Sequence, residues 1–127
     1  MRAYLDSSAI FKLNHDERET LALIDFLDEG PIEVSTSVVG EIEVLHNLRK
    51  RRLDTDQAMA GFYLLGLDDE VRRVAIEIGG GVVRALDAIH IATALAVGDR
   101  DLRFVTYDNR QAAAAREAGL TVVQPGR

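Results

Sequence analysis

The sequence contains no cysteine, and this absence excludes several kinds of site at once. Disulfide bonds, thiolate nucleophiles and zinc sites built on cysteine are all ruled out. No apolar run approaches the length of a membrane-spanning helix. An acidic residue already stands at position 6, too early for a secretory signal peptide, so we expect a cytoplasmic protein.

A phosphate-binding loop is also missing. Gly79, Gly80 and Gly81 stand together, but no Gly-Lys-Ser or Gly-Lys-Thr ending follows them. Without that ending the three glycines predict only a flexible break between two helices.

The chain has a composition that suits one folded unit. It has 127 residues, of which 47% are hydrophobic, enough to build a core, so we expect a single domain over residues 1–127. The net charge of −6 counts only weakly against a nucleic-acid partner, because basic residues cluster locally in Arg49, Lys50, Arg51 and Arg52. This run is either an exposed helix end or a contact for phosphates.

Hydrophobic periodicity predicts strands that alternate with helices, which indicates an α/β fold with a parallel sheet covered on both faces. In open sheets of this kind, ligands bind at the carboxyl ends of the strands where the strand order reverses. The predicted strands are 2–5, 32–35, a short one near Leu67, 103–106 and 121–123, and the predicted helices are 17–28, 38–50, 55–65, 71–78, 86–97 and 109–118.

Four acidic residues lie at or near the edges of these elements: Asp6, Glu41, Asp87 and Asp108. Asp6 and Asp108 follow predicted strands, so the carboxyl-end rule allows them to meet in one crevice. Carboxylates that fold together from distant parts of a chain repel one another, and a divalent cation is the usual remedy. The placement of these acids therefore predicts a metal site.

Each acid also has a simpler interpretation. Asp6 and Asp108 both suit the N-cap of a helix, and Gln111 completes a capping-box pattern with Asp108. A capping carboxylate can still bind a metal, because the cap uses only one of its oxygens. Glu41 can be a solvated charge in the first turn of a helix, which the helix dipole favours.

Asp87 is harder to explain as a solvated charge. It lies in the apolar segment Leu86-Asp87-Ala88-Ile89-His90-Ile91-Ala92, where a half-buried carboxylate needs a partner. That partner is either Arg84, three residues earlier, or a metal. His90 lies on the same helix face and can bind metal, relay protons or simply pack with a hydrogen bond.

Taken in order, four segments of this chain resemble the PIN-domain nucleases, and most of all the VapC-type ribonuclease toxins. The resemblance implies a three-layer α/β/α PIN-like domain with five parallel strands in the order 3-2-1-4-5. It also implies an endoribonuclease that depends on Mg²⁺ or Mn²⁺. The segments are Asp6-Ser7-Ser8-Ala9, Glu41, Leu86-Asp87-Ala88-Ile89-His90-Ile91-Ala92-Thr93-Ala94 and Thr106-Tyr107-Asp108.

The same resemblance assigns roles to individual residues. Asp6, Glu41, Asp87 and Asp108 match the acidic quartet of the family, which is catalytic and binds metal, and Ser8 and Thr106 match hydroxyl positions that support it. In the expected mechanism Asp6 anchors the main ion with help from Asp87 and Asp108. Glu41 orients or deprotonates the water, or holds a second ion. Asn109-Arg110 stands where many relatives carry another acid, which leaves the ligands of a second ion open.

Partners follow from the resemblance as well. A toxin of a type II toxin–antitoxin pair implies an RNA substrate, a cognate antitoxin that places a basic side chain in the acidic site, and a homodimer. Phe62-Tyr63-Leu64-Leu65 is the candidate apolar surface for dimer formation. The alternatives are a PIN-type RNA-processing nuclease without an antitoxin, an RNA-binding domain without activity, and a receiver-like signalling module. The last usually needs paired acids after the first strand, where this chain has Ser7.

Overall fold

The structure is a computed structural model that describes residues 1–78 and 83–127, and its five strands form one parallel sheet in the order β3-β2-β1-β4-β5. This is the predicted strand order, and it is confirmed. The strands are β1 (Arg2–Leu5), β2 (Glu33–Ser37), β3 (Phe62–Leu65), β4 (Arg103–Val105) and β5 (Thr121–Val123). The helices are α1 (Ser7–Asn14), α2 (Thr20–Leu27), α3 (Val38–Lys50), α4 (Asp69–Glu77), α5 (Ala85–Val97) and α6 (Asn109–Glu117).

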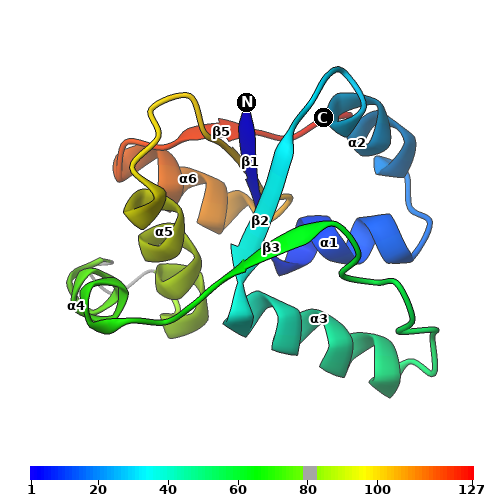
Figure 1. The fold of residues 1–127 in the computed structure, drawn as a ribbon, viewed down its shortest axis with the longest axis horizontal. Coiled ribbons are helices and arrows are strands. Elements are labelled where there is room, and N and C mark those ends of the chain that lie inside the picture. The colour runs from blue at the N-terminus through cyan, green and yellow to red at the C-terminus, as the bar shows by residue number, and fades with distance from the viewer. Residues whose placement is uncertain (79–82) are drawn as a thin grey trace.

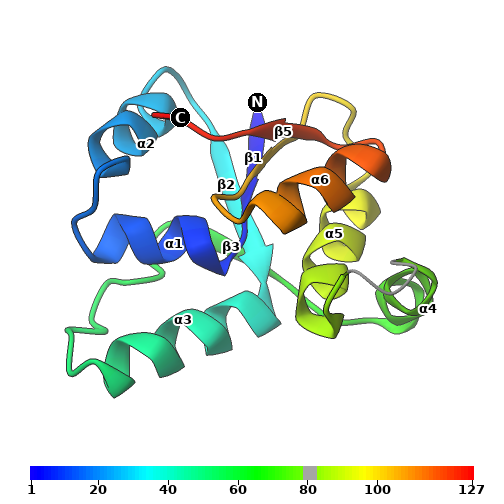
Figure 2. The same cartoon turned by 180° about the vertical axis from the view of Figure 1, so that it is seen from behind.

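Helices cover both faces of the sheet. Helices α1, α2 and α3 lie together on one face, and α4, α5 and α6 lie on the other (Figure 1). Seen from behind, α1 and α3 run side by side below α2 (Figure 2). The predicted three-layer α/β/α architecture is therefore confirmed.

The central strand β1 divides the hydrophobic core in two. Ala3 and Leu5 are fully buried in the cluster on the α1–α3 side, whereas Tyr4 between them is buried in the other cluster with Ile91 and Phe104. This alternation follows from the strand geometry, in which successive side chains point to opposite faces.

The strands β1 and β4 end beside each other. Leu5 is in register with Val105, and the backbone N–H of Asp6 donates to the carbonyl of Val105 at 3.1 Å. The loop from β1 into α1 therefore touches the loop from β4 into α6. This is the crevice at which sequence reasoning placed the site.

The sequence prediction contains two errors about helices, one wrong helix and one missing helix. Residues 55–65 do not form a helix: they make a turn followed by β3, and the strand expected near Leu67 lies earlier. Gln57 and Gly61 have φ values of 64° and 82°, which are incompatible with a right-handed helix. The turn that contains them packs Ala58 against the core. The spacing of apolar residues that predicted a helix face therefore reflects a buried turn.

The second error is an omission, because α1 is absent from the predicted elements although Asp6 was considered as a cap. Its serines and asparagine are weak helix formers, so local propensity gives little signal. The break predicted at residues 79–81 lies outside the described residues. None of the helices in the described ranges is long and apolar enough to span a bilayer.

Candidate active site

Asp6 is a buried carboxylate, only 3% exposed, at the N-cap of α1. Its Oδ1 accepts hydrogen bonds from the backbone N–H of Ala9 at 3.1 Å and the hydroxyl of Ser8 at 2.6 Å. Its Oδ2 accepts from the Thr106 hydroxyl and, at 3.4 Å, from Nε2 of Gln111. The simpler interpretation of Asp6 as a cap is thus correct for one oxygen, while the other faces β4 and α6.

Ser8 and Thr106 connect the two loops at this edge of the sheet. Each hydroxyl donates to Asp6 and also accepts from a backbone N–H: Ser8 from Tyr107 at 3.0 Å, and Thr106 from Asp108 at 3.1 Å. A hydroxyl can do both, because it has one proton and two lone pairs. The two side chains therefore fix the start of α6 relative to Asp6.

Asp108 caps α6, as its sequence pattern also allowed. Its Oδ1 accepts from the backbone N–H groups of Arg110 at 2.9 Å and Gln111 at 3.3 Å. Its Oδ2 has no hydrogen-bond partner within residues 1–78 and 83–127, and the side chain is exposed. One oxygen of Asp108 is therefore available at the mouth of the crevice.

Asp87 lies in the first turn of α5, half-buried and close to other acids. Burial raises the pKa of its carboxyl group, and the negative charges of Asp108, Asp6 and Glu43 raise it further. In the described part of the chain it makes no ion pair with Arg84, the partner considered from the sequence. The three carboxylates whose charges act on Asp87 therefore include Glu43 of α3, and they come from different elements.

Glu43 was missed by sequence reasoning, which selected Glu41 on the same helix. Oε1 of Glu43 lies 2.8 Å from Nε2 of His90, and Glu43 lines the cavity described below. Glu41 is partly exposed, and it has no side-chain hydrogen bond or ion pair among the residues that the structure describes.

An open groove of about 960 Å³ runs between α1 and α3, beside these acids. The α3 side carries polar residues at helical spacing, and the α1 side carries a serine, an aromatic ring and a lysine. That polar stripe is the sequence signal that could have identified Glu43, since it marks a second face of α3 beside the buried one. The α3 residues are Glu43, His46, Asn47 and Lys50, and the α1 residues are Ser8, Phe11 and Lys12.

The basic run at the end of α3 divides between the groove and other surfaces. Lys50 and Arg51 line the groove, whereas Arg49 and Arg52 are exposed and do not. The guanidinium carbon of Arg51 lies 4.9 Å from the centre of the Phe11 ring, a cation–π arrangement that holds the charge at the groove wall.

The donor chemistry of the acids fits a hard divalent cation. Asp6, Asp87 and Asp108 form no ion pair with a lysine or arginine of the described residues. Within those residues no three acidic or histidine side chains already form a closed metal cage. Mg²⁺ does not require one, because it keeps several waters and is held by one or two carboxylates. The carboxylate oxygens of these three acids, which have no lysine or arginine partner in the described residues, therefore suit Mg²⁺ or Mn²⁺.

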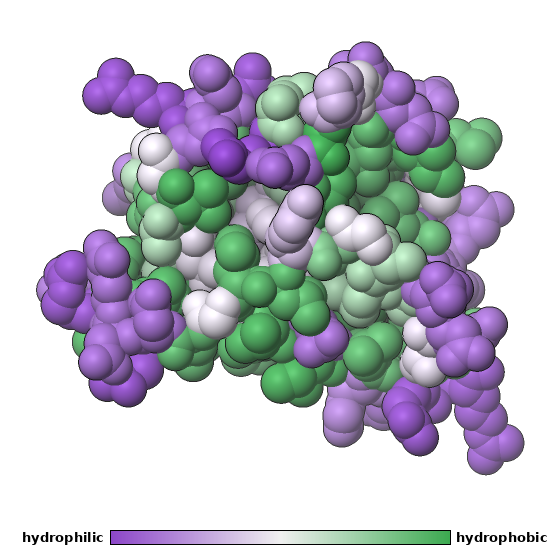
Figure 3. Space-filling view, viewed as in Figure 1, coloured by the Kyte–Doolittle hydropathy of each residue, from purple (hydrophilic) through white to green (hydrophobic). Residues whose placement is uncertain are grey.

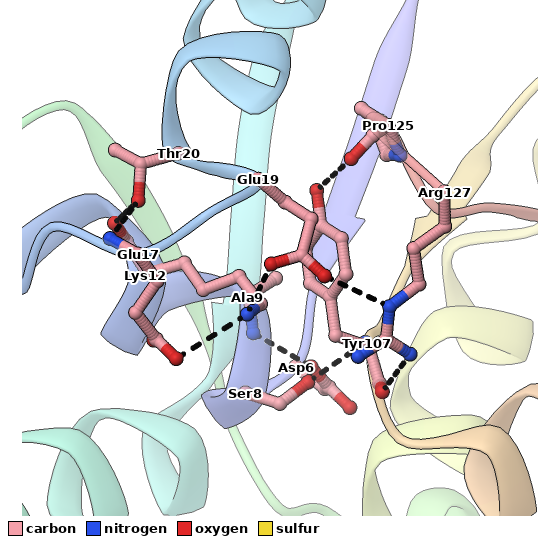
Figure 4. Close-up of polar contacts among 10 residues, drawn as sticks. All are labelled: Asp6, Ser8, Ala9, Lys12, Glu17, Glu19, Thr20, Tyr107, Pro125 and Arg127. Carbon is pink, nitrogen blue, oxygen red and sulfur yellow. Dashed lines mark hydrogen bonds and ion pairs between the residues drawn. The ribbon is translucent and has the colours of Figure 1, made fainter.

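A second charged cluster lies at the other end of α1, and there the charges are paired (Figure 4). Glu19 accepts from Nζ of Lys12 at 3.0 Å and from Nε of Arg127 at 2.9 Å. These hydrogen bonds, first that of Lys12 and then that of Arg127, lower the pKa of Glu19 to about 2. Both cations lie against the Tyr107 ring, at 4.8 and 5.4 Å from its centre. Sequence reasoning had no signal for this cluster.

The chain matches one protein family and several curated relatives. The family model described as the PIN domain matches residues 3–117. Among curated proteins, the chain is similar to Ribonuclease VapC47 of Mycobacterium tuberculosis (strain CDC 1551 / Oshkosh). The two are 34% identical over 131 residues, which cover 97% of this chain and 96% of the relative.

Solved structures share the fold. Mycobacterium tuberculosis VapC20, described as a sarcin-ricin loop cleaving toxin, superposes with a TM-score of 0.76 at 17% identity, over 97% of this chain and 99% of that one. A toxin–antitoxin complex from Klebsiella pneumoniae gives a TM-score of 0.74 at 20% identity, over 97% of each chain. At these identities the structural matches establish the fold, including the predicted PIN-like topology.

Proposed function

Because this chain belongs to the PIN-domain family and its curated relatives are VapC ribonucleases, we propose that it is an endoribonuclease and the toxin of a toxin–antitoxin pair. In this proposal residues 1–127 act as one PIN-like domain that hydrolyses RNA phosphodiester bonds. The observation that carries the proposal is the group of carboxylates beside the groove between α1 and α3, which have no lysine or arginine partner among the described residues.

The carboxylates have different roles in this proposal because they lie at different positions in the site. Asp6, fixed by four hydrogen-bond donors, is the rigid anchor for a divalent cation, and Asp87 and Asp108 complete the oxygen ligands from α5 and α6. A bound Mg²⁺ or Mn²⁺ ion supplies charge stabilisation for the phosphate oxygens and lowers the pKa of the attacking water. Ser8 and Thr106 act indirectly, by holding Asp6 in one orientation.

We assign the fourth acidic position to Glu43 in preference to Glu41. Glu43 lines the groove and influences Asp87, so it is placed to orient the attacking water or to hold a second ion. Glu41 makes no comparable contact in the described part of the chain. The residue after Asp108 is Asn109 and supplies no further carboxylate, so the ligands of a second ion are left open.

The groove offers a path for the RNA strand. Lys50 and Arg51 are placed on its wall to contact phosphates, about two helical turns along α3 from Glu43. Such contacts position a strand without reading its sequence, because phosphates carry no sequence information. Arg49 and Arg52 lie outside the groove, so we expect them to contribute only long-range attraction.

The proposed protein partners are an antitoxin and a second copy of the chain. The structure from Klebsiella pneumoniae is described as a toxin–antitoxin complex, and an antitoxin arginine or lysine would suit the unbalanced carboxylates here. For the dimer we propose the surface around β3, where Tyr63, Leu64 and Leu67 are exposed. Hydrophobic residues gather near the centre of this face of the molecule (Figure 3).

A cleavage assay on total cellular RNA tests the proposal. The wild-type protein should cut RNA when Mg²⁺ or Mn²⁺ is added and stop when EDTA is added, with the cut ends mapped by sequencing. Asp87→Asn should remove cleavage in both metals, because it removes one ligand charge. Cleavage that persists in EDTA would contradict the metal-dependent proposal.

The antitoxin part has a separate test. A small open reading frame beside the gene should encode a protein that binds this chain and inhibits its cleavage of RNA. An active nuclease with no such inhibitor would favour the RNA-processing alternative.

A further inference from the structure

Three buried or half-buried side chains from three elements are linked in a row behind the acidic site. Tyr4 of β1 and His90 of α5 are 0% and 1% exposed, and the Tyr4 hydroxyl lies 2.6 Å from Nδ1 of the His90 ring. Nε2 of the same ring lies 2.8 Å from Oε1 of Glu43. We propose that His90, oriented by Tyr4, is a positioning residue that fixes the Glu43 carboxylate in the active site. This rests on the role proposed above for Glu43.

The hydrogen-bond inventory favours one arrangement of the protons in this row. The backbone N–H of Ser37 donates to the Tyr4 oxygen at 3.1 Å, so that oxygen is already an acceptor. Its own proton is then available for Nδ1 of His90. A neutral imidazole that accepts at Nδ1 carries its proton on Nε2, and that proton points at Glu43. Burial raises the pKa of Tyr4, which keeps its hydroxyl protonated.

Packing leaves the His90 ring little freedom to turn away. The Tyr4 ring meets it edge-on, with centroids 5.7 Å apart, and Tyr4 itself stacks on Phe104 at 5.4 Å. On the other side α3 passes so closely that a Cβ atom added at Gly40 would lie 2.9 Å from Cε1 of His90. The ring is therefore clamped, and its hydrogen bond gives Glu43 a single preferred orientation.

A buried row of hydrogen bonds can also serve stability alone, and the two roles make different predictions. If the row positions Glu43, its loss lowers kcat while the protein stays folded and KM changes little. If it serves stability alone, its loss lowers the unfolding temperature and leaves the kcat of the folded protein unchanged. Partners of active-site ligands commonly affect activity by about 10- to 100-fold.

The variants are compared by kcat and KM on a fluorogenic RNA oligonucleotide of mixed sequence, with circular dichroism to establish folding. His90→Leu should lower kcat about tenfold or more, with KM within about threefold of wild type. His90→Gln should recover most of that loss, because its side-chain amide can donate to Glu43. Tyr4→Phe, which keeps the ring stacked on Phe104, should give a smaller loss, and the exposed His15→Leu serves as the matched control.

A readout without RNA comes from ¹⁵N–¹H spectra of the histidine rings of the wild-type protein, with His90→Gln identifying the His90 signals. A neutral ring with its proton on Nε2 supports the proposal. A charged ring also carries a proton on Nε2 and supports the proposal, whereas a neutral ring with its proton on Nδ1 overturns it, and so does wild-type kcat in folded His90→Leu. If His90→Leu does not fold, the kcat of folded Tyr4→Phe is compared with that of wild type, and an unchanged kcat overturns the proposal. If wild-type protein cleaves no RNA, the proposed function fails, and the ring spectrum still decides this inference.

Discussion

The two ends of α1 carry two charged clusters that have opposite electrostatic character. At its N-terminus Asp6 is buried without a lysine or arginine partner in the described part of the chain, and burial raises the pKa of its carboxyl group. At its C-terminal end Lys12 pairs with Glu19, whose pKa falls to about 2. Six residues, about 9 Å of helix, separate Asp6 from Lys12.

The difference shows how one helix can carry both stability and function. Where the chain supplies cations, a carboxylate contributes to the free energy of unfolding. Where it supplies only hydroxyl, amide and N–H donors, the carboxylate keeps an unbalanced charge that a metal ion or a basic side chain of a partner can neutralise.

The largest effect is expected from removing the charge of Asp6. Asp6→Asn should lower RNA cleavage by more than about a hundredfold, because it removes the anchor for the metal. In EDTA at pH 7 the substitution should raise the unfolding temperature. The folded-state pKa of Asp6 lies above its ordinary value, so folding disfavours the charged carboxylate, and the neutral amide of asparagine avoids this cost. Asparagine can still cap α1.

Thermal unfolding and cleavage are measured on the same preparation of Asp6→Asn. A variant that is less stable than wild type in EDTA would contradict the unbalanced-charge account. Loss of activity together with higher stability would support it. Oε1 of Gln111, which has no hydrogen-bond partner in the described residues, could then accept from the new amide.

The second prediction sharpens the assignment at the acidic end. Glu43→Gln should lower cleavage by about a hundredfold, because it removes a charge that acts on Asp87 and lines the groove. Glu41→Gln is the matched control on the same helix and should change the rate less than about threefold. The measurement is the initial rate of cleavage of one RNA oligonucleotide by each variant. A larger loss of rate in Glu41→Gln than in Glu43→Gln would assign the role to Glu41.

The third prediction concerns the paired end. Glu19→Gln should lower the unfolding temperature by about 5 °C, because it leaves Lys12 buried without its main partner. RNA cleavage at 25 °C should change little. Arg72→Gln, which removes an exposed ion pair with Asp69, is the control and should shift the temperature much less.

The same pair predicts a pH dependence with a defined sign. The folded pKa of Glu19 is about 2 against an ordinary 4.5, so its contribution is complete above pH 4.5 and is lost as the pH falls from 4.5 toward 2. Chemical unfolding at several pH values should therefore show a steeper loss of stability for wild type than for Glu19→Gln in this range. Parallel curves would show that Glu19 is not responsible.

The smallest effect is expected from the groove wall. Lys50→Gln should raise KM for RNA a few-fold and weaken its salt dependence, because one phosphate contact is removed. Arg49→Gln, one residue away but outside the groove, should change KM less. Equal effects of the two substitutions would indicate that the basic run acts only through long-range attraction.

Sequence reasoning recovered most of the fold because the relevant signals are local. Helices such as α3 and α5 and strands such as β1 and β4 were predicted within a few residues, since periodic apolar positions specify them. The helix predicted at residues 55–65 failed because the buried position of Ala58 comes from a turn against the core. The spacing of apolar residues cannot distinguish burial on a helix face from burial in a turn that packs against the core.

The sequence alone was enough for most of the helices and strands, for the acids at the ends of β1 and β4 and for the caps Asp6 and Asp108, because these depend on neighbours within a few positions. The tertiary contacts set which glutamate of α3 meets His90 and acts on the charge of Asp87, and which cations pair with Glu19. Each of these depends on partners brought together from distant parts of the chain, 108 residues apart for Arg127 and Glu19. At these sites the charge balance is therefore set by tertiary contacts, which no local pattern encodes.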